Sequence, residues 1–316
     1  MKYRELGNSE LTVSEIGFGA WGIGGSAGGH AAYGLTDDAE SIRALHAALD
    51  AGVTLYDTSD LYGMGHSELL IGRAFQQRRD QVVIATKGGM VNPAGEQDFS
   101  PSYLRGALER SLSRLASDYV DLYQLHSPPP EELEQIADLA HFLETLVKEG
   151  KARVTGVSAR SPQEALLLVE RHGFRSIQAN LNLLDWRAID CGLLERCRSL
   201  GVGVIARTPL CFGFLTGRYS CDNVSDPHDH RARWPREQLE RWIAAAASYG
   251  AVINSGGEQT SGQKSLRFCL SFDVVSAVIP GMLTAEQVQE NILASSLGAL
   301  TPEELIQVER IYRETC

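Results

Sequence analysis

The chain has 316 residues, of which 43% are hydrophobic and 22% charged, and its formal net charge is -11. This length allows a large buried core, and the lack of any apolar run as long as a membrane span argues against a membrane protein. The negative net charge argues against a nucleic-acid partner, because such a partner would require a basic stripe.

The chain opens with a pattern typical of a small hairpin. Two short strands, Tyr3 to Leu6 and Leu11 to Val13, flank a Gly7-Asn8 turn. Short and nearly all-apolar runs then recur along the chain, as expected of strands that are buried on both faces. They cover residues 16–19, 53–57, 82–87, 120–125, 153–158, 176–180, 202–207 and 274–279.

Segments with a period near 3.6 lie between these strands. Asp37 or Asp38 opens a helix that ends near Ala51-Gly52, and Ser100-Pro101 opens another that runs to Leu115. Further helices are predicted at 131–149, 162–171, 189–200 and 284–295, and a terminal helix with Thr301 as its N-cap. The alternation predicts an α/β protein, a (β/α)8 TIM barrel with an N-terminal β-hairpin and a C-terminal helix.

No linker or change of composition divides the chain, so we expect a single domain over residues 1–316. Its longest connection, residues 210–237, follows the seventh strand and is rich in Gly, Asp, His, Arg and Pro. In a barrel this loop lies over the carboxyl-terminal face of the sheet, where it could act as a lid.

The cysteines and histidines give no sign of a metal site. The six cysteines show neither a CxxC motif nor metal-ligand spacing with histidine, and His228 and His230 lie in a polar loop. Residues 1–15 contain no readable signal peptide. We therefore expect free thiols, no metal and a cytoplasmic protein.

One glycine motif suggests a different fold. Gly22-Ile23-Gly24-Gly25-Ser26-Ala27 matches G-x-G-x-x-G/A, the dinucleotide-binding fingerprint of Rossmann domains. A helix should begin within that turn, yet no helical pattern follows at once. Asp57, which would bind the ribose, also comes about fifteen residues too late. A flexible first βα loop explains the glycines better.

Four polar residues fall at or just after the ends of successive predicted strands. Asp57, Lys87 and His126 each end or follow an apolar run, and Tyr62 lies in the loop after Asp57. Because the carboxyl ends of parallel strands share one face of a barrel, these side chains should gather there. Taken singly, each has a structural interpretation, such as a loop cap, a packed ring or a solvated amine. Their order along the chain favours one common site.

An acid, a phenol, an amine and an imidazole together can transfer protons at neutral pH. A free phenol has a pKa of about 10, but a lysine cation 4 Å away favours its ionised form by roughly 4 kcal/mol in a protein-like medium. Tyr62 would then be the general acid, with Lys87 and Asp57 tuning it. His126 would hydrogen-bond the substrate oxygen and orient it.

Three motifs around these residues resemble the catalytic motifs of the aldo-keto reductases. They are Asp57-Thr58-Ser59-Asp60-Leu61-Tyr62-Gly63, Ala85-Thr86-Lys87-Gly88 and Asp121-Leu122-Tyr123-Gln124-Leu125-His126. The similarity extends over nearly the whole chain. It implies a barrel that binds NADP or NAD without a Rossmann domain. It also implies hydride transfer between the nicotinamide and a small-molecule carbonyl or sugar substrate, with the tyrosine protonating the oxygen.

The resemblance further implies a set of cofactor-binding residues. Ser158 and Gln178 would hydrogen-bond the nicotinamide carboxamide, and Leu210 to Thr216 would line the pyrophosphate. Arg207 stands where many members place an aromatic ring against the nicotinamide. The set is Ser158, Gln178, Arg207, Pro209, Leu210, Gly213, Leu215, Gly281, Gln287, Glu290 and Asn291, the last four at the adenosine end.

The chain departs from the family pattern at further cofactor positions. Ala159 replaces an asparagine that often follows the serine, and Gln287 replaces an arginine seen in some members. Met282-Leu283 stands where NADPH-using relatives commonly offer a basic residue to the 2'-phosphate. Since a phosphate dianion requires a cation or a helix amino terminus, NADH becomes a serious alternative to NADPH.

Two other functions are weighed against an oxidoreductase. A non-catalytic nucleotide-binding accessory or sensor protein of the same fold would explain the altered cofactor contacts. It would not explain why the chain keeps all four proton-transfer residues, Asp57, Tyr62, Lys87 and His126, which we call the tetrad. A hydrolase using Asp57 and His126 lacks both a nucleophile and a metal site. Four aromatic residues are candidates for the pocket wall, with core or surface packing as the alternative: Trp21, Tyr56, Phe212 and Trp234.

Overall fold

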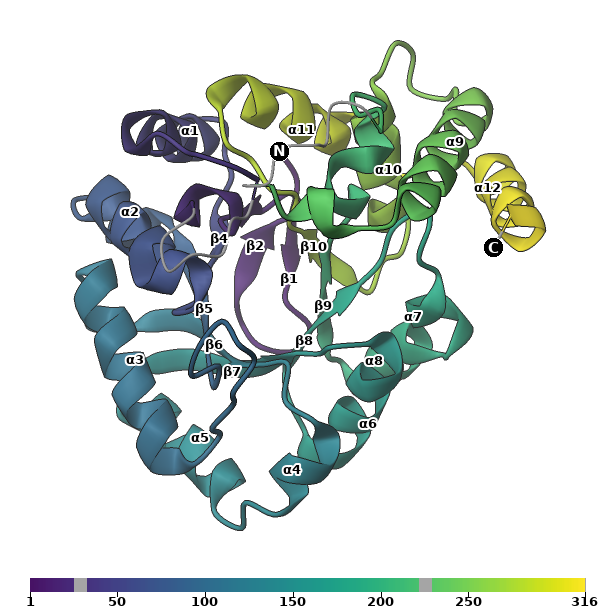
Figure 1. Ribbon diagram of the computed structural model, residues 1–316. Coiled ribbons are helices and arrows are strands. Elements are labelled where there is room, and N and C mark those ends of the chain that lie inside the picture. The colour runs from purple at the N-terminus through teal and green to yellow at the C-terminus, as the bar shows by residue number, and fades with distance from the viewer. Residues whose placement is uncertain (26–32, 222–228, 316) are drawn as a thin grey trace.

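Eight parallel strands form the centre of the computed structural model, which describes residues 1–25, 33–221 and 229–315. The strands are β3 (Phe18–Gly19), β4 (Leu55–Asp57), β5 (Val83–Gly88), β6 (Val120–His126), β7 (Ala152–Ser158), β8 (Ser176–Asn180), β9 (Gly203–Arg207) and β10 (Val275–Val278). Their order in the sheet follows their order in the chain. Helices are arranged around them (Figure 1).

The first and last strands meet and close the sheet into a barrel. Parallel bridges join Ile16 to Val278 and Gly19 to Gly281, and the Gly17 amide donates to the Val278 carbonyl over 2.8 Å. Closure removes the free edges of the sheet. The predicted (β/α)8 barrel is confirmed, and the Rossmann interpretation of the glycine motif, which requires an open doubly wound sheet, is excluded.

The predicted hairpin is present and closes the amino-terminal end of the barrel. It pairs β1 (Tyr3–Glu5) with β2 (Thr12–Ser14) in antiparallel register. Its apolar residues Leu6, Leu11 and Val13 are buried against side chains from inside the barrel. Those partners are Leu55, Ala85, Leu122, Val154, Ile205, Ala277 and Ile279. The opposite, carboxyl-terminal end is thereby left for a site.

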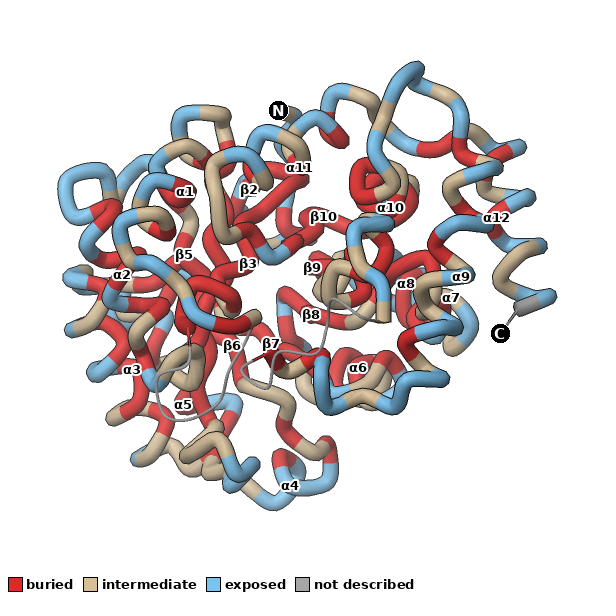
Figure 2. The backbone as a smooth tube through the Cα atoms, turned by 45° about the horizontal axis from the view of Figure 1, so that its top comes forward, coloured by how far each residue is buried: buried red, intermediate tan, exposed pale blue. Residues whose placement is uncertain are grey.

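Helices cover the outside of the barrel with their buried faces turned inward (Figure 2). They are α1 (Asp38–Asp50), α2 (His66–Phe75), α3 (Pro101–Leu115), α4 (Pro130–Glu134), α5 (Leu139–Lys148), α6 (Pro162–His172), α7 (Arg187–Asp190), α8 (Leu193–Leu200), α9 (Arg236–Val252), α10 (Ser261–Leu270), α11 (Ala285–Leu297) and the terminal α12 (Pro302–Thr315). Asp37 and Ser100 cap α1 and α3 through their side chains, as predicted.

The prediction of one helix over 131–149 is wrong, because α4 and α5 are separate. The apolar stripe of α5 consists of Leu139, Phe142, Leu143 and Leu146, all buried. On a continuous helix Leu133 would lie on a different face from that stripe. The break lets Leu133 reach the core as well, where it is 2% exposed. Burying both Leu133 and the apolar stripe of α5 is therefore more favourable than continuing one helix through residues 131–149.

Two further segments differ from the sequence prediction. The predicted helix 189–200 is interrupted at Gly192, whose φ of 79° is left-handed, so that α7 and α8 are distinct. The connection 210–237 is shorter than predicted, since α9 begins at Arg236. Its described part also forms two 3-10 turns, η5 (Cys211–Thr216) and η6 (His230–Arg233). Residues 222–228 of this connection lie outside the described residues.

Within the ranges that the structure describes, no helix combines the length and apolar character needed to cross a bilayer.

The contact between hairpin and barrel generates a stability prediction. A Cβ on Gly203 would lie 2.6 Å from the Gly7 nitrogen and from the Leu6 carbonyl carbon. Gly203→Ala should therefore push the hairpin away and lower the free energy of unfolding by about 1–3 kcal/mol, as measured by urea denaturation.

Gly106→Ala in α3 is the matched control, since within 4 Å a Cβ there would meet only the flexible end of the Arg110 side chain, at 3.3 Å, and alanine favours helix. It should raise the free energy of unfolding by about 0.5–1 kcal/mol. Unchanged stability of Gly203→Ala would contradict the proposed packing of the hairpin.

Candidate active site

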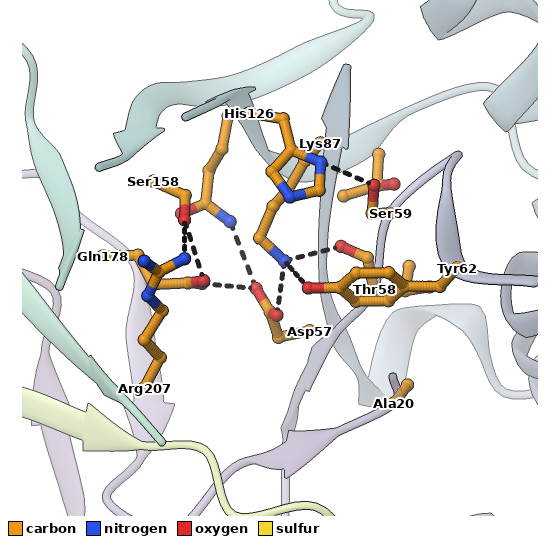
Figure 3. Close-up of polar contacts among 12 residues, drawn as sticks. Ala20, Asp57, Thr58, Ser59, Tyr62, Lys87, His126, Ser158, Gln178 and Arg207 are labelled. Atoms are coloured by element: carbon orange, nitrogen blue, oxygen red, sulfur yellow. Dashed lines mark hydrogen bonds and ion pairs between the residues drawn. The ribbon is translucent and has the colours of Figure 1, made fainter. Parts of the chain in front are cut away.

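The four residues of the predicted tetrad lie together at the carboxyl-terminal end of the barrel (Figure 3). Asp57 and His126 are the last residues of β4 and β6, and Lys87 lies near the end of β5. Tyr62 begins the 3-10 turn η3 (Tyr62–Gly65). The closed parallel barrel is what brings these strand ends to one rim.

A tight turn places Tyr62 over this rim. Gly63, Met64 and Gly65 have φ angles of 58°, 53° and 91°, so three successive residues are left-handed. A Cβ on Gly63 would lie 2.1 Å from the Gly24 carbonyl oxygen. Glycine is therefore required at position 63 for the turn to pack against the first βα loop.

Lys87 is the centre of the hydrogen-bond network. Its side chain is fully buried, and Nζ donates to Asp57 Oδ1 over 2.5 Å, to the Thr58 carbonyl over 2.9 Å and to Tyr62 Oη over 3.2 Å. An ammonium has three protons, so all its donors are used. Burial by itself would lower the pKa of Lys87, but the charges of Asp57 and Tyr62 and their hydrogen bonds raise it. Lys87 is thus a fixed cation at neutral pH.

Asp57 accepts hydrogen bonds on both carboxylate oxygens. Lys87 donates to Oδ1, while Gln124 Nε2 and Gln178 Nε2 donate to Oδ2 over 3.2 and 2.7 Å. Gln124 was missed by the sequence analysis. It lies two residues before His126 on β6, and this spacing, which places both side chains on one face of the strand, was a usable signal.

The hydrogen bonds also settle where the Tyr62 proton lies. Because the Lys87 ammonium can only donate, the Tyr62 oxygen accepts from it. The phenolic hydrogen therefore points away from Lys87, and Tyr62 lines the cavity described below. This is the geometry of a proton donor aimed at a ligand.

His126 is held by a residue that the sequence analysis did not single out. Its Nδ1 lies 3.0 Å from the Ser59 hydroxyl. Burial, followed by the positive charges of Lys87 and Arg207, holds the pKa of His126 well below its usual range. The ring is therefore uncharged at neutral pH and can donate or accept one hydrogen bond at its other nitrogen.

A second line of hydrogen bonds leads from Asp57 to Arg207. Because Gln178 Nε2 is bound to Asp57, its Oε1 faces Ser158, whose hydroxyl donates to it over 3.1 Å. Arg207 in turn donates to Ser158 Oγ over 3.3 Å. The Gln178 amide orientation and the donor role of Ser158 are thus fixed by the network.

Arg207 and Ala159, two of the residues that depart from the family pattern, are in direct contact. The Arg207 guanidinium donates to the Ala159 carbonyl over 2.7 Å. Arg207 also donates to Asn180 Oδ1 over 2.7 Å. Among the described residues its hydrogen-bond partners are all uncharged. Burial lowers the pKa of Arg207, opposed by the charges of Tyr62 and Asp57. A partly buried cation that lines the cavity without a carboxylate partner gives this end of the site a positive field.

One cavity of about 600 Å³ joins these residues to the predicted adenosine end. This volume is in the usual range for ligand sites. The predicted site residues that line it are Asp57, Tyr62, His126, Gln178, Arg207, Pro209, Leu210, Gly213, Gly281, Gln287, Glu290 and Asn291. Lys87 and Ser158 are buried and act on the cavity through their partners.

Leu215 and the four aromatic candidates are divided between cavity and core. Trp21 and Phe212 line the cavity. Leu215 and Tyr56 are buried in the core instead. Trp234 packs on Phe212, with ring centroids 4.7 Å apart, and therefore supports the wall without lining it.

The segment after β9 runs along the cavity in a strained conformation. Thr208, Cys211, Phe212 and Gly213 have φ angles of 51°, 44°, 56° and 96°. Such clusters of left-handed backbone are typical of functional loops. Arg218 and Arg231 line the same part of the cavity, Arg218 paired with Glu290 and Arg231 with Asp229.

The described part of the long connection lies across this cavity. Asp229 forms an antiparallel bridge with Tyr33 of the first βα loop, and the Arg231 guanidinium lies over the Tyr33 ring at 5.0 Å. Both Tyr33 and Arg231 line the cavity. The two loops thus meet over the site, as a lid would.

Within the described residues, no group of three or more His, Cys, Asp or Glu side chains is arranged to hold a metal ion, and Cys191, Cys197, Cys211, Cys221 and Cys269 are free thiols.

The comparisons with known proteins all point to the same family. The sequence model of the Aldo/keto reductase family matches residues 15–313. An NADH-specific methylglyoxal reductase of Escherichia coli (strain K12) is 31% identical, over 94% of this chain and 94% of its own length. The aldo-keto reductase yakc of Schizosaccharomyces pombe, whose name specifies NADP(+), is also 31% identical, over 99% of this chain and 91% of its own.

A solved structure agrees with this result. The glycerol dehydrogenase from Gluconobacter oxydans has a TM-score of 0.80 and 29% identity, with 99% of this chain and 95% of that chain covered.

The lowered pKa of His126 generates a prediction for stability against pH. The unfolded ring takes up a proton near pH 6.5, whereas the folded ring does so only at a lower pH. The stabilisation is therefore complete above pH 6.5 and is lost as the pH falls. Between pH 7 and pH 5.5, wild type should lose about 1 kcal/mol more unfolding free energy than His126→Asn.

Urea denaturation at the two pH values measures this difference. His141→Asn, at an exposed position of α5, is the control and should follow wild type. Equal losses in wild type and His126→Asn would show that His126 titrates normally in the folded protein.

Proposed function

The chain belongs to the aldo/keto reductase family, and from this membership we propose that Tyr62 is the general acid and base of its reaction. The protein is an NAD(P)-dependent oxidoreductase. The reaction proposed for it is the interconversion of a small aldehyde, ketone or sugar with the corresponding alcohol. The single observation that carries this proposal is the saturated Lys87 ammonium, which leaves the Tyr62 proton free to face the cavity.

Tyr62 serves the two directions of the reaction through the same oxygen. In reduction it donates its proton to the carbonyl oxygen, and the Lys87 cation 3.2 Å away stabilises the phenolate left behind. In oxidation the phenolate takes the hydroxyl proton back. Asp57 keeps Lys87 charged and in place during both steps. His126, uncharged and bound to Ser59, holds the substrate oxygen beside Tyr62.

The residues of the cavity fit a nicotinamide dinucleotide. When bound, the cofactor supplies or accepts the hydride. Gln178 lines the cavity, and its Oε1 is fixed as an acceptor that suits the amide hydrogens of a carboxamide. The Ser158 hydroxyl donates to Oε1 and holds it in this orientation. Arg218 and Arg231 would face the diphosphate in the middle of the cavity. Gly281, Gln287, Glu290 and Asn291 would hold the adenosine.

The far end of the cavity supports NADH as the preferred cofactor. Met282 is fully buried, and the Leu283 amide donates to Gln287 Oε1 over 2.8 Å. Among the described residues, the cation that lines the cavity at this adenosine end is Arg218, and it already pairs with Glu290. A 2'-phosphate would add negative charge beside the Glu290 carboxylate. The ribose hydroxyls of NADH avoid that repulsion.

A non-catalytic sensor is less well supported. Binding alone would not require a buried lysine whose every donor is used to orient a tyrosine and a carboxylate. Such a network is costly to bury, and its chemistry is that of proton transfer.

Replacing Tyr62 with Phe tests the general acid. Tyr62→Phe should lower kcat for reduction of a simple aldehyde by a factor on the order of 10² to 10⁴, because the proton donor is lost. The dissociation constant of the reduced cofactor should change little. Tyr3→Phe, which removes a hydroxyl at the exposed end of the hairpin, is the control and should retain full activity. A fully active Tyr62→Phe variant would end the proposed mechanism.

A titration tests the cofactor preference. NADH should bind at least about tenfold more tightly than NADPH, a difference of roughly 1.4 kcal/mol, as measured by quenching of tryptophan fluorescence. Leu283→Arg places a cation at the adenosine end and should tighten NADPH binding while leaving NADH binding nearly unchanged. Tighter binding of NADPH by wild type would reject the preference for NADH.

A further inference from the structure

Ser59 connects His126 to a second carboxyl group that lies outside the tetrad. The Ser59 hydroxyl lies 3.0 Å from His126 Nδ1 and 3.2 Å from Asp60 Oδ1, and it accepts the Leu61 amide hydrogen over 3.1 Å. A hydroxyl has one hydrogen to donate and two lone pairs to accept with. With three neighbours, Ser59 is saturated, so its hydrogen can serve either Asp60 or His126 but not both.

The His126 ring has only one proton to place. Lys87 from β5 and Arg207 from β9 face the ring, and burial together with these two cations keeps it uncharged. Among the described residues, Ser59 is the one hydrogen-bond partner of the ring. The direction of the Ser59 hydrogen bond therefore decides whether Nδ1 or Nε2 is protonated.

Asp60 is surrounded by groups of both signs. Glu68 of α2 faces it, as do Arg110, Arg114 and Tyr103 of α3 and Tyr123 of β6. Glu68 is fully buried and bound to Arg114 over 2.6 Å, so the two charges largely offset each other. Burial, with the Glu68 charge, raises the pKa of Asp60 to about 7, against the opposing effects of Ser59, Arg114 and Arg110.

We propose that Asp60, acting through Ser59, sets the tautomer of His126 and thereby decides whether the ring offers the substrate oxygen a hydrogen-bond donor, as proton transfer at Tyr62 requires, or a lone pair. Asp60 and Ser59 are positioning residues in this scheme, since neither lines the cavity. The inference deepens the proposed oxidoreductase function and rests on it.

With Asp60 ionised, the carboxylate accepts the Ser59 hydrogen. The Ser59 oxygen then accepts from Nδ1–H, and Nε2 is left with a lone pair. A bare Nε2 accepts the hydrogen of an alcohol. An alcohol has only one hydroxyl hydrogen, so this Nε2 competes for it with the Tyr62 phenolate and the proton transfer to Tyr62 is blocked.

With Asp60 protonated, the carboxyl hydrogen is donated to the Ser59 oxygen. The Ser59 hydrogen turns to Nδ1, and the ring carries its proton on Nε2 instead. The proton balance is simple: Asp60 takes up one proton from solvent, while the ring releases one from Nδ1 and binds one at Nε2. Nε2–H donates to a carbonyl oxygen, which is the substrate of the reduction. The site changes from one state to the other as the pH passes through about 7.

Nitrogen NMR of the histidine side chains measures the tautomer without any turnover. In protein labelled with ¹⁵N-histidine, the signals of His126 are assigned by their loss in His126→Asn. In wild type we expect Nε2–H at pH 5.5, Nδ1–H at pH 8.5 and a crossing near pH 7. In Asp60→Asn, which cannot titrate, the tautomer should be the same at every pH.

Asp118→Asn removes an exposed carboxyl group between α3 and β6 and is the matched control, which should keep the crossing. One tautomer throughout in wild type, or a crossing that persists in Asp60→Asn, would overturn the proposal.

The pH profile of reduction provides the kinetic test. In wild type, kcat/KM for a carbonyl substrate should fall about tenfold for each pH unit above about 7. This decline should be absent between pH 6 and pH 8 in Asp60→Asn and in Ser59→Ala. An unchanged inflection in both variants would overturn the proposal. A protein without turnover would instead remove the proposed oxidoreductase function, and the NMR crossing would still decide the role of Asp60.

Discussion

The buried ion pair of Lys87 and Asp57 is the interaction on which the site depends. Removing a lysine and a carboxylate from water is costly, and the cost is offset only if both are fully hydrogen-bonded. Lys87 meets that condition with Asp57, Thr58 and Tyr62, and Asp57 meets it with two glutamines. Each partner is held in one orientation as a result. The catalytic geometry is therefore a consequence of satisfying two buried charges.

The closed barrel makes this pairing possible. The contributing side chains come from β4, β5, β6 and β8, whose ends converge only when the sheet is closed. At the other end the hairpin fills the barrel with apolar residues. Stability and chemistry are thus separated along the barrel axis, as is usual for this fold. The network also extends outward, since His126 is linked through Ser59 to Asp60 and Gln178 through Ser158 to Arg207.

Local patterns predicted the elements well where one signal dominated. The strands were recognisable because burial on both faces requires continuous apolar runs, and α1 and α3 because their caps are encoded in the adjacent residues. The prediction of one helix over residues 131–149 was wrong because helical periodicity does not show which face of a helix packs against the core. Leu133 and Leu139 both had to be buried, and only a break between α4 and α5 allows it.

By itself, the sequence determined the alternation of strands and helices, the closing hairpin and the positions of Asp57, Tyr62, Lys87 and His126 at or just after strand ends. These features follow from residue order and side-chain periodicity, which are local properties. Only the tertiary structure decided which side chains pair. Gln124 and Gln178 share Asp57, Arg207 has uncharged hydrogen-bond partners among the described residues, and Ser59 lies between His126 and Asp60. Hydrogen bonds and pKa shifts depend on distances between residues far apart in the chain, and these distances exist only once the barrel has closed.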